Sequence, residues 1–133
     1  DAQSVNIFHA LFVAIPVGAL AVAILVVNNL RDIPTDRAAG KRTLAVRLGD
    51  GATRTHYALC IWIAMLWPLL LMKSFGIAVL VTFLAAPMAL RAVADVRVKT
   101  GSELNASLAA TAKLQLVHGV LLAIGIAADS LRW

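Results

Sequence analysis

The composition of this chain of 133 residues is that of a membrane protein. Hydrophobic residues make up 61% of it and charged residues 14%, whereas soluble domains hold roughly 45–50% apolar and about 25% charged residues. So large an apolar share exceeds what a core of this size can bury, which excludes an ordinary soluble domain. The net charge is +5, but the basic residues fall mostly between apolar runs. We therefore expect their partner to be a membrane surface or an anionic substrate, and not nucleic acid.

Four apolar runs are long enough to cross a bilayer, whose core of about 30 Å needs roughly 20 helical residues. Only Lys73 and Ser74 separate the second run from the third, so these two must form an antiparallel hairpin. The runs lack strand-like alternation. The sequence predicts an all-α membrane protein with a single membrane domain over residues 1–133. Its four transmembrane helices are expected at about residues 7–30, 53–72, 75–93 and 104–127.

Several residues interrupt these apolar runs. Pro16 and Gly18 lie within the first run, which ends near Val27, and they predict a kink in that helix. We interpret His9 and His118, which lie on apolar helices, as packing residues that make hydrogen bonds. The aromatic residues typical of interface anchors or lipid contacts are Trp62, Trp67 and Trp133.

The distribution of lysine and arginine predicts how the chain is oriented in the membrane. Residues 31–54 carry six basic side chains and residues 91–103 carry three. An even number of spans separates the two loops, so both should face the same side. Because basic loops stay in the cytoplasm, we expect a multi-pass protein of the cell (inner) membrane with both loops cytoplasmic. Thr100 and Glu103 fit a capping box that starts the fourth helix.

The first of these loops carries the chemistry. Asn28, Asp32 and Asp36 recur every four residues, and on a helix this spacing puts them in one stripe. Mg²⁺ prefers oxygen ligands, binds through one or two carboxylates and completes its shell with water and substrate phosphates. Two aspartates one turn apart suit that role. The cations that follow, which suit diphosphate oxygens, are Arg37, Lys41 and Arg42.

Two considerations compete with this interpretation. Pro34 disfavours helical geometry at Ile33, so we expect the first span to end near Arg31 and Asp32 to cap a short new helix. A polar loop after a span is also often only a solvated loop with a positive-inside bias. The adjacent amides Asn28 and Asn29 favour a site, because paired amides at the end of a span are costly unless they have partners.

The stretch from Asn28 to Gly49, NNLRDIPTDRAAGKRTLAVRLG, closely resembles the second aspartate-rich motif of the UbiA superfamily of intramembrane prenyltransferases. Within that superfamily it is most similar to the branch that prenylates 1,4-dihydroxy-2-naphthoate in menaquinone biosynthesis. The segment from Leu104 to Leu116 resembles the last helix of the family. Its matching polar residues are Thr111, Lys113 and Gln115.

The resemblance implies a fold and an activity. Family members have nine helices and two aspartate-rich motifs, so these four helices would match the last four, and a missing N-terminal half would carry the first motif. The implied reaction transfers a polyprenyl group from polyprenyl diphosphate to 1,4-dihydroxy-2-naphthoate with Mg²⁺ as cofactor and loss of carbon dioxide. The alternatives are another aromatic acceptor, such as 4-hydroxybenzoate or a tetrapyrrole, and a non-catalytic membrane module whose basic loop binds lipid.

The resemblance also assigns roles to residues. Asp32 and Asp36 would bind the metal, and Asn28 the metal or the diphosphate. The diphosphate contacts would be Lys41, Arg37 and Arg42. Asn29 and Lys113 are candidates for the substrate pocket. Lys113 would lie about 13 Å inside the fourth span, where a cation is either functional or reaches back to the interface.

Overall fold

The computed structural model of the chain describes residues 7–130, and all of its regular elements in that range are helices. Side chains are described as far as residue 128, so Trp133 lies outside the described residues. The predicted all-α membrane fold is confirmed. In chain order the elements are α1 (Ile7–Ala38), α2 (Leu44–Leu48), α3 (Asp50–Leu66), α4 (Pro68–Phe75), the 3₁₀-helix η1 (Ile77–Ala85), α5 (Ala86–Val98), the 3₁₀-turn η2 (Gly101–Glu103) and α6 (Leu104–Ser130).

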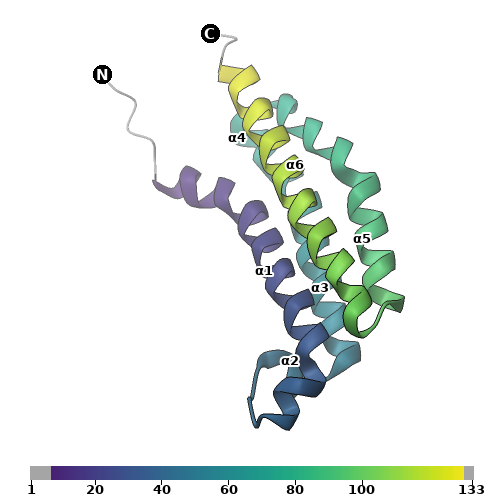
Figure 1. Cartoon of the computed structure of the whole chain (residues 1–133). Coiled ribbons are helices and arrows are strands. Elements are labelled where there is room, and N and C mark those ends of the chain that lie inside the picture. Colours follow the sequence, from purple (N-terminus) through teal and green to yellow (C-terminus); the bar gives the residue numbers. More distant parts are fainter. Residues whose placement is uncertain (1–6, 131–133) are drawn as a thin grey trace.

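Four helical passes are long and apolar enough to cross a membrane: α1, α3 with α4, η1 with α5, and α6. Figure 1 shows them running alongside one another, with the start of α1 and the end of α6 at one end of the molecule. The α2 segment and the connection between α5 and α6 lie toward the opposite end. The two basic loops are therefore at the same end, as their charge predicts.

The first helix is longer than expected. It does not end near Arg31 but continues through Pro34 to Ala38, so the predicted break and the new helix capped by Asp32 are wrong. Pro34 is exposed and lies beyond the apolar stretch. A missing backbone donor costs less there than within lipid, and the helix tolerates it.

The predicted kink appears in the N-terminal part of α1, which bends away from the other helices (Figure 1). Pro16 lies inside this helix and is buried. The ring of Phe12, one turn earlier, packs on that of Trp67 with centroids 5.0 Å apart. Trp67 therefore contacts α1 and is half-buried, whereas Trp62 is exposed. The predicted lipid or interface contact of these two residues stays a prediction.

The second and third passes form the predicted hairpin, but their boundaries differ from the prediction. The turn lies at Gly76, with φ of 77°, and not at Lys73 and Ser74, which belong to α4. Glycine ends a helix in this way because a positive φ carries no side-chain penalty. The second pass changes from α3 to α4 at Trp67, and the third begins as a 3₁₀-helix before Ala86.

Close backbone contact explains part of this arrangement. A Cβ atom at Gly125 of α6 would lie 2.7 Å from the carbonyl oxygen of Ala78 and 2.7 Å from the Cα of Val79 in η1. Membrane helices pack through small residues in this way because lipid gives no hydrophobic drive for their association. Deeper in the bundle, the Tyr57 hydroxyl of α3 makes a buried 2.7 Å hydrogen bond with Thr111 of α6.

Candidate functional site

The end of α1 presents the predicted polar stripe on one uninterrupted helix. Asn28, Asp32 and Asp36 follow one another at one-turn intervals. Asn28 and Asp32 are partly exposed, whereas Asp36 is buried with 8% of its surface accessible. The C-terminus of a helix carries a partial negative charge. This end of α1 therefore favours cations, and an anion placed here needs basic side chains or a metal ion beside it.

Arg31 organises the first half of this stripe. Its Nε donates to Oδ1 of Asp32 at 2.8 Å, and its Nη2 donates to Oδ2 of the same carboxylate at 3.0 Å. The same Nη2 also donates to Oδ1 of Asn28 at 2.9 Å. This bidentate pairing holds the amide and the carboxylate in fixed relative positions.

The pairing affects the acidity of Asp32, which lies beyond the apolar run that ends at Val27. The hydrogen bonds from Arg31 lower the pKa of Asp32, because they favour its charged form. Asp36, one turn later, forms an ion pair with Lys41, whose Nζ lies 3.3 Å from Oδ1. Both aspartates thus lie beside a cation.

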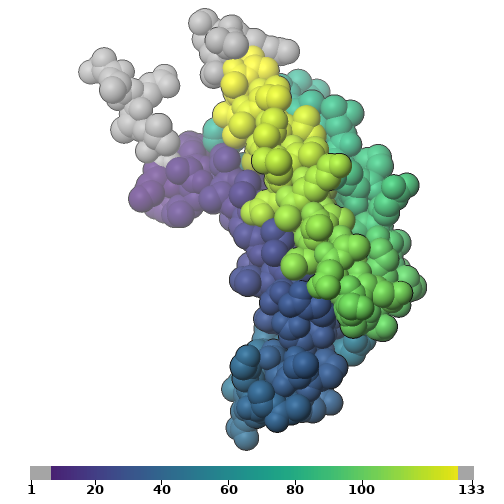
Figure 2. Space-filling view, viewed as in Figure 1, coloured from purple at the N-terminus to yellow at the C-terminus, as the bar shows by residue number. Residues whose placement is uncertain are grey.

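Arg31 also connects the stripe to the start of α6, which follows the second basic loop. Its Nη1 donates to Oδ1 of Asn105, the second residue of α6, at 2.7 Å. Figure 2 shows the dark-blue end of α1 beside the green start of α6 on the same face of the molecule. The guanidinium of Arg54, in α3, donates to the carbonyls of Val96 and, at 2.9 Å, Lys99. Arg31 thus joins the end of α1 to the start of α6, and Arg54 joins the start of α3 to the end of α5.

Of the remaining candidate residues, Arg37 and Arg42 follow Asp36 closely in the sequence and are exposed, in positions open to an anion. Asn29 lines a different space of about 180 Å³, between α1, α2 and α3, together with Thr53 and His56. Lys113 is exposed on α6, nine residues after Leu104, which is roughly 13 Å along the helix. Lys113 and Asn29 are thus not brought to the same place.

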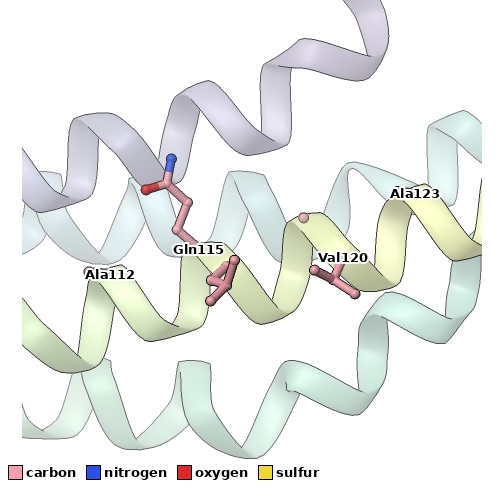
Figure 3. A pocket seen from close by; sticks show the side chains of 6 residues that line it. Ala112, Gln115, Val120 and Ala123 are labelled. Atoms are coloured by element: carbon pink, nitrogen blue, oxygen red, sulfur yellow. The ribbon is translucent and has the colours of Figure 1, made fainter.

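An apolar groove runs along α6 on its side toward α1. It is an open hollow of about 430 Å³ whose lining residues all belong to α6: Gln115, Leu116, Gly119 and Val120 together with two alanines. Figure 3 shows the Gln115 side chain pointing toward α1, and its amide lies 3.4 Å from the Val17 carbonyl. Small residues at Ala112, Gly119 and Ala123 keep the groove open.

The donor set at the end of α1 fits a divalent cation that keeps part of its own shell. Within residues 7–128 no three His, Cys, Asp or Glu side chains gather as a closed metal site. Two carboxylates and an amide on one helix supply only oxygen atoms and leave coordination positions for water and phosphate. That pattern suits Mg²⁺ and excludes a closed structural zinc centre.

Sequence reasoning missed two residues of this cluster. Arg31 was counted only as part of a basic loop, and Asn105 only as the start of the last helix. Both lie inside segments that resemble the family, at positions 74 residues apart. Their joint presence in those segments was the available signal, but spacing within one helix cannot reveal a contact between two helices.

Comparison with known proteins places the chain in a family. Residues 2–125 match the UbiA prenyltransferase family. The 1,4-dihydroxy-2-naphthoate octaprenyltransferase of Mycobacterium tuberculosis is 44% identical over 115 residues, which cover 86% of this chain and 39% of the relative. The protein of the same name from Escherichia coli is 37% identical over 113 residues, with 82% and 36% covered.

A vertebrate relative is more distant. UbiA prenyltransferase domain-containing protein 1 of Danio rerio is 31% identical over 113 residues, which cover 85% of the chain and 33% of that protein. No solved structure matches the chain. The chain spans about two fifths of the length of the bacterial relatives that it matches. With its family match over nearly its whole length, its four apolar passes and its aspartate stripe, the chain belongs to the UbiA prenyltransferase family.

Proposed function

We propose that the chain forms the diphosphate-binding part of a Mg²⁺-dependent prenyltransferase of menaquinone biosynthesis. The reaction transfers a polyprenyl group from polyprenyl diphosphate to 1,4-dihydroxy-2-naphthoate with loss of carbon dioxide. The names of the bacterial relatives support this acceptor and an octaprenyl donor class. The observation that carries the proposal is the stripe of Asn28, Asp32 and Asp36 on one helix, with basic residues beside it.

In this proposal the acidic residues bind the metal ion and the basic residues bind the diphosphate. Asp32 and Asp36 hold the ion through carboxylate oxygens, and Asn28 adds an amide oxygen to the ion or to the diphosphate. Mg²⁺, when bound, neutralises the charge that develops on the diphosphate as it leaves. Lys41, Arg37 and Arg42 contact the diphosphate oxygens that lie away from the ion. Lys41, already placed beside Asp36, is the first of these contacts in our assignment.

Bond making and breaking balance without a redox partner. The allylic carbon–oxygen bond breaks and its electron pair leaves with the diphosphate. The electron-rich ring forms the new carbon–carbon bond, and the ring carboxylate leaves as carbon dioxide, so that its bonding electrons restore the aromatic ring. The open groove along α6 would hold the apolar isoprenoid chain, and a further segment would have to cover it to exclude water from the cation-like carbon. Asn29 and Lys113 remain candidates for contacts with the substrates.

A second acidic cluster is needed to hold a diphosphate from both sides. We propose that a partner segment equivalent to the N-terminal portion of the relatives carries this cluster and packs against these four helices in the bilayer. The chain by itself should then be inactive. Prenyl transfer by the purified chain alone, with magnesium and both substrates, would contradict this division of labour.

The test of the function is prenyl transfer by the complete enzyme with Asp32→Ala or Asp36→Ala. Each change should remove most of the activity, because a metal ligand and its charge are lost together. Asp95→Ala is the matched control, since Asp95 also pairs with a lysine, Lys99, at 2.8 Å, but lies outside the stripe. Near-normal activity of either stripe variant at ordinary magnesium concentration would refute the proposal. Turnover of 4-hydroxybenzoate but not of the naphthoate would show that the proposed acceptor is wrong.

The alternative is a membrane module whose basic loop binds anionic lipid. Such a loop gains nothing from two aspartates among its cations. Loss of prenyl transfer in the aspartate variants, with unchanged membrane binding, separates the two functions.

A further inference from the structure

Arg31 lies beside the stripe and makes four hydrogen bonds to side chains, yet the proposed function gives it no role. It occupies both carboxylate oxygens of Asp32 and the amide oxygen of Asn28, which are atoms that the metal ion needs. A carboxylate oxygen has more than one lone pair, so Arg31 and an ion can share Asp32 in part. Two cations on one carboxylate nevertheless repel each other, and binding of the ion must weaken the Arg31 contact.

The position of Arg31 determines what its guanidinium can contact once the metal ion has displaced it from Asp32. Its Nη1 is held by Asn105 of α6 through a contact that involves none of the metal ligands. The guanidinium therefore stays at the site when Asp32 turns to the ion. A side chain with five donors in a planar fork, next to a metal-bound diphosphate, is well suited to bind phosphate oxygens in pairs.

We propose that Arg31 is an exchange residue that holds Asp32 and Asn28 in place while the site is empty, and contacts the diphosphate once the metal ion has bound. Asn105 serves as its anchor on α6. This inference rests on the proposed function, because it takes Asp32 as a metal ligand. It adds a diphosphate contact that precedes Asp32 in the sequence, whereas the other proposed contacts follow it: Arg37, Lys41 and Arg42.

Opposite effects on two binding constants distinguish this role from a purely structural one. In Arg31→Gln the competing cation is gone, so Mn²⁺ alone should bind about tenfold more tightly than to the unmodified chain. The phosphate contact is gone as well, so inorganic pyrophosphate at saturating Mn²⁺ should bind about tenfold more weakly. A side chain that only supported the fold would weaken both.

The probes are Mn²⁺, followed by electron paramagnetic resonance, and inorganic pyrophosphate, with the chain held in lipid nanodiscs. Asn105→Ala should weaken pyrophosphate binding without tightening Mn²⁺ binding, because it removes the anchor and keeps the cation on Asp32. Arg31→Lys, which keeps the charge but loses the fork, should show a smaller change in both constants. Arg47→Gln is the matched control: it removes the same charge from an exposed position of α2 and should leave both constants within about twofold.

The outcomes separate this inference from the proposed function. If the unmodified chain does not bind Mn²⁺, or if Asp32→Asn still binds it equally well, the metal site is wrong and this inference fails with it. If Mn²⁺ binds and Asp32→Asn abolishes binding, but Arg31→Gln fails to tighten Mn²⁺ binding or leaves pyrophosphate binding unchanged, only the exchange role is overturned. Tighter Mn²⁺ binding together with weaker pyrophosphate binding supports it.

Discussion

The indole N–H of Trp67 donates a 2.9 Å hydrogen bond to the backbone carbonyl of Phe12. In an uninterrupted helix that carbonyl would accept from residue 16, but residue 16 is proline and has no N–H. An unpaired carbonyl is costly in lipid, where water does not reach it. Trp67, from the break between α3 and α4, therefore supplies the donor that Pro16 removes, and the kink of α1 is stabilised by a neighbouring helix.

A double-mutant cycle tests this relationship. Trp67→Phe keeps an aromatic ring beside Phe12 but removes the donor, and should cost about 1 kcal/mol of unfolding free energy. In a Pro16→Ala background the Phe12 carbonyl regains its helical partner, so the same change should cost measurably less. Unfolding of the chain in mixed micelles, followed by circular dichroism, gives the four free energies. Additive effects, within about 0.3–0.5 kcal/mol, would show that Trp67 and Pro16 are independent.

A second proline repeats the pattern deeper in the bundle. Pro68 begins α4 and cannot donate to the carbonyl of Ala64, one turn earlier. His118 of α6 is fully buried, and its ring interacts with the backbone of Ala64. Among the described residues, neither ring nitrogen reaches a partner at full hydrogen-bonding geometry. We expect the carbonyl freed by Pro68 to be the acceptor for the imidazole N–H. The burial of His118 agrees with its predicted packing role, whereas its predicted hydrogen bond is not formed within the part of the chain that the structure describes and stays a prediction.

The prediction for His118 follows the same logic with a different control. His118→Leu should destabilise the chain by about 1 kcal/mol, because the Ala64 carbonyl then lacks a donor. In Pro68→Ala, where residue 68 can donate, the leucine should be tolerated or even favourable. The readout is the midpoint of thermal unfolding in detergent. An equal loss in both backgrounds would mean that His118 serves only to fill space.

The sequence predicted the helical passes well because each is a long apolar run, and a run of that kind has few alternatives in a bilayer. The same holds for the polar stripe, since Asn28, Asp32 and Asp36 are related by the period of one helix. The end of α1 was predicted less well. The rule that proline disfavours helix at the preceding residue was applied at Ile33, but near the exposed end of a helix its cost is small.

The contacts between helices could not be predicted from the sequence. Trp67 was expected at a lipid interface on composition alone, and only the packing of α4 against α1 brings it to Phe12. The contact from Arg31 to Asn105 depends in the same way on how α6 lies against α1. The turn was predicted a few residues before Gly76, because Lys73 and Ser74 are the polar residues that separate the two apolar runs.

Gly125 should tolerate no larger residue. A Cβ there would meet the backbone of Ala78 and Val79 at 2.7 Å, a distance that requires η1 to shift. Gly125→Ala should therefore destabilise the chain, by about 1–3 kcal/mol. Gly119→Ala is the matched control on the same helix, since its Cβ would have nothing within 4 Å; it should be neutral or stabilising by about 0.5–1 kcal/mol through helix propensity. Equal stability of the two variants would contradict the close approach of α6 to η1.

Labelling of single cysteines tests the orientation of the chain in the membrane. The structure places residues 31–54 and 91–103 at one end, because Arg31 contacts Asn105 and Arg54 contacts Lys99. Cysteines introduced at Ala39 and Ser102, both exposed, must therefore be accessible from the same side of the membrane. The nine basic residues of these segments predict that they face the cytoplasm. A membrane-impermeant maleimide should reach them only after lysis, and should reach Ser74→Cys, at the hairpin, in intact cells.

The buried Cys60 is replaced by alanine so that the chain itself contributes no other thiol. Labelling of both Ala39→Cys and Ser102→Cys from outside would show that the predicted orientation is reversed. The fold would stand, because the two loops would still lie on the same side of the membrane. Labelling of only one of them from outside would contradict the fold itself. The contacts of Arg31 and Arg54 allow no arrangement in which a bilayer separates the two loops.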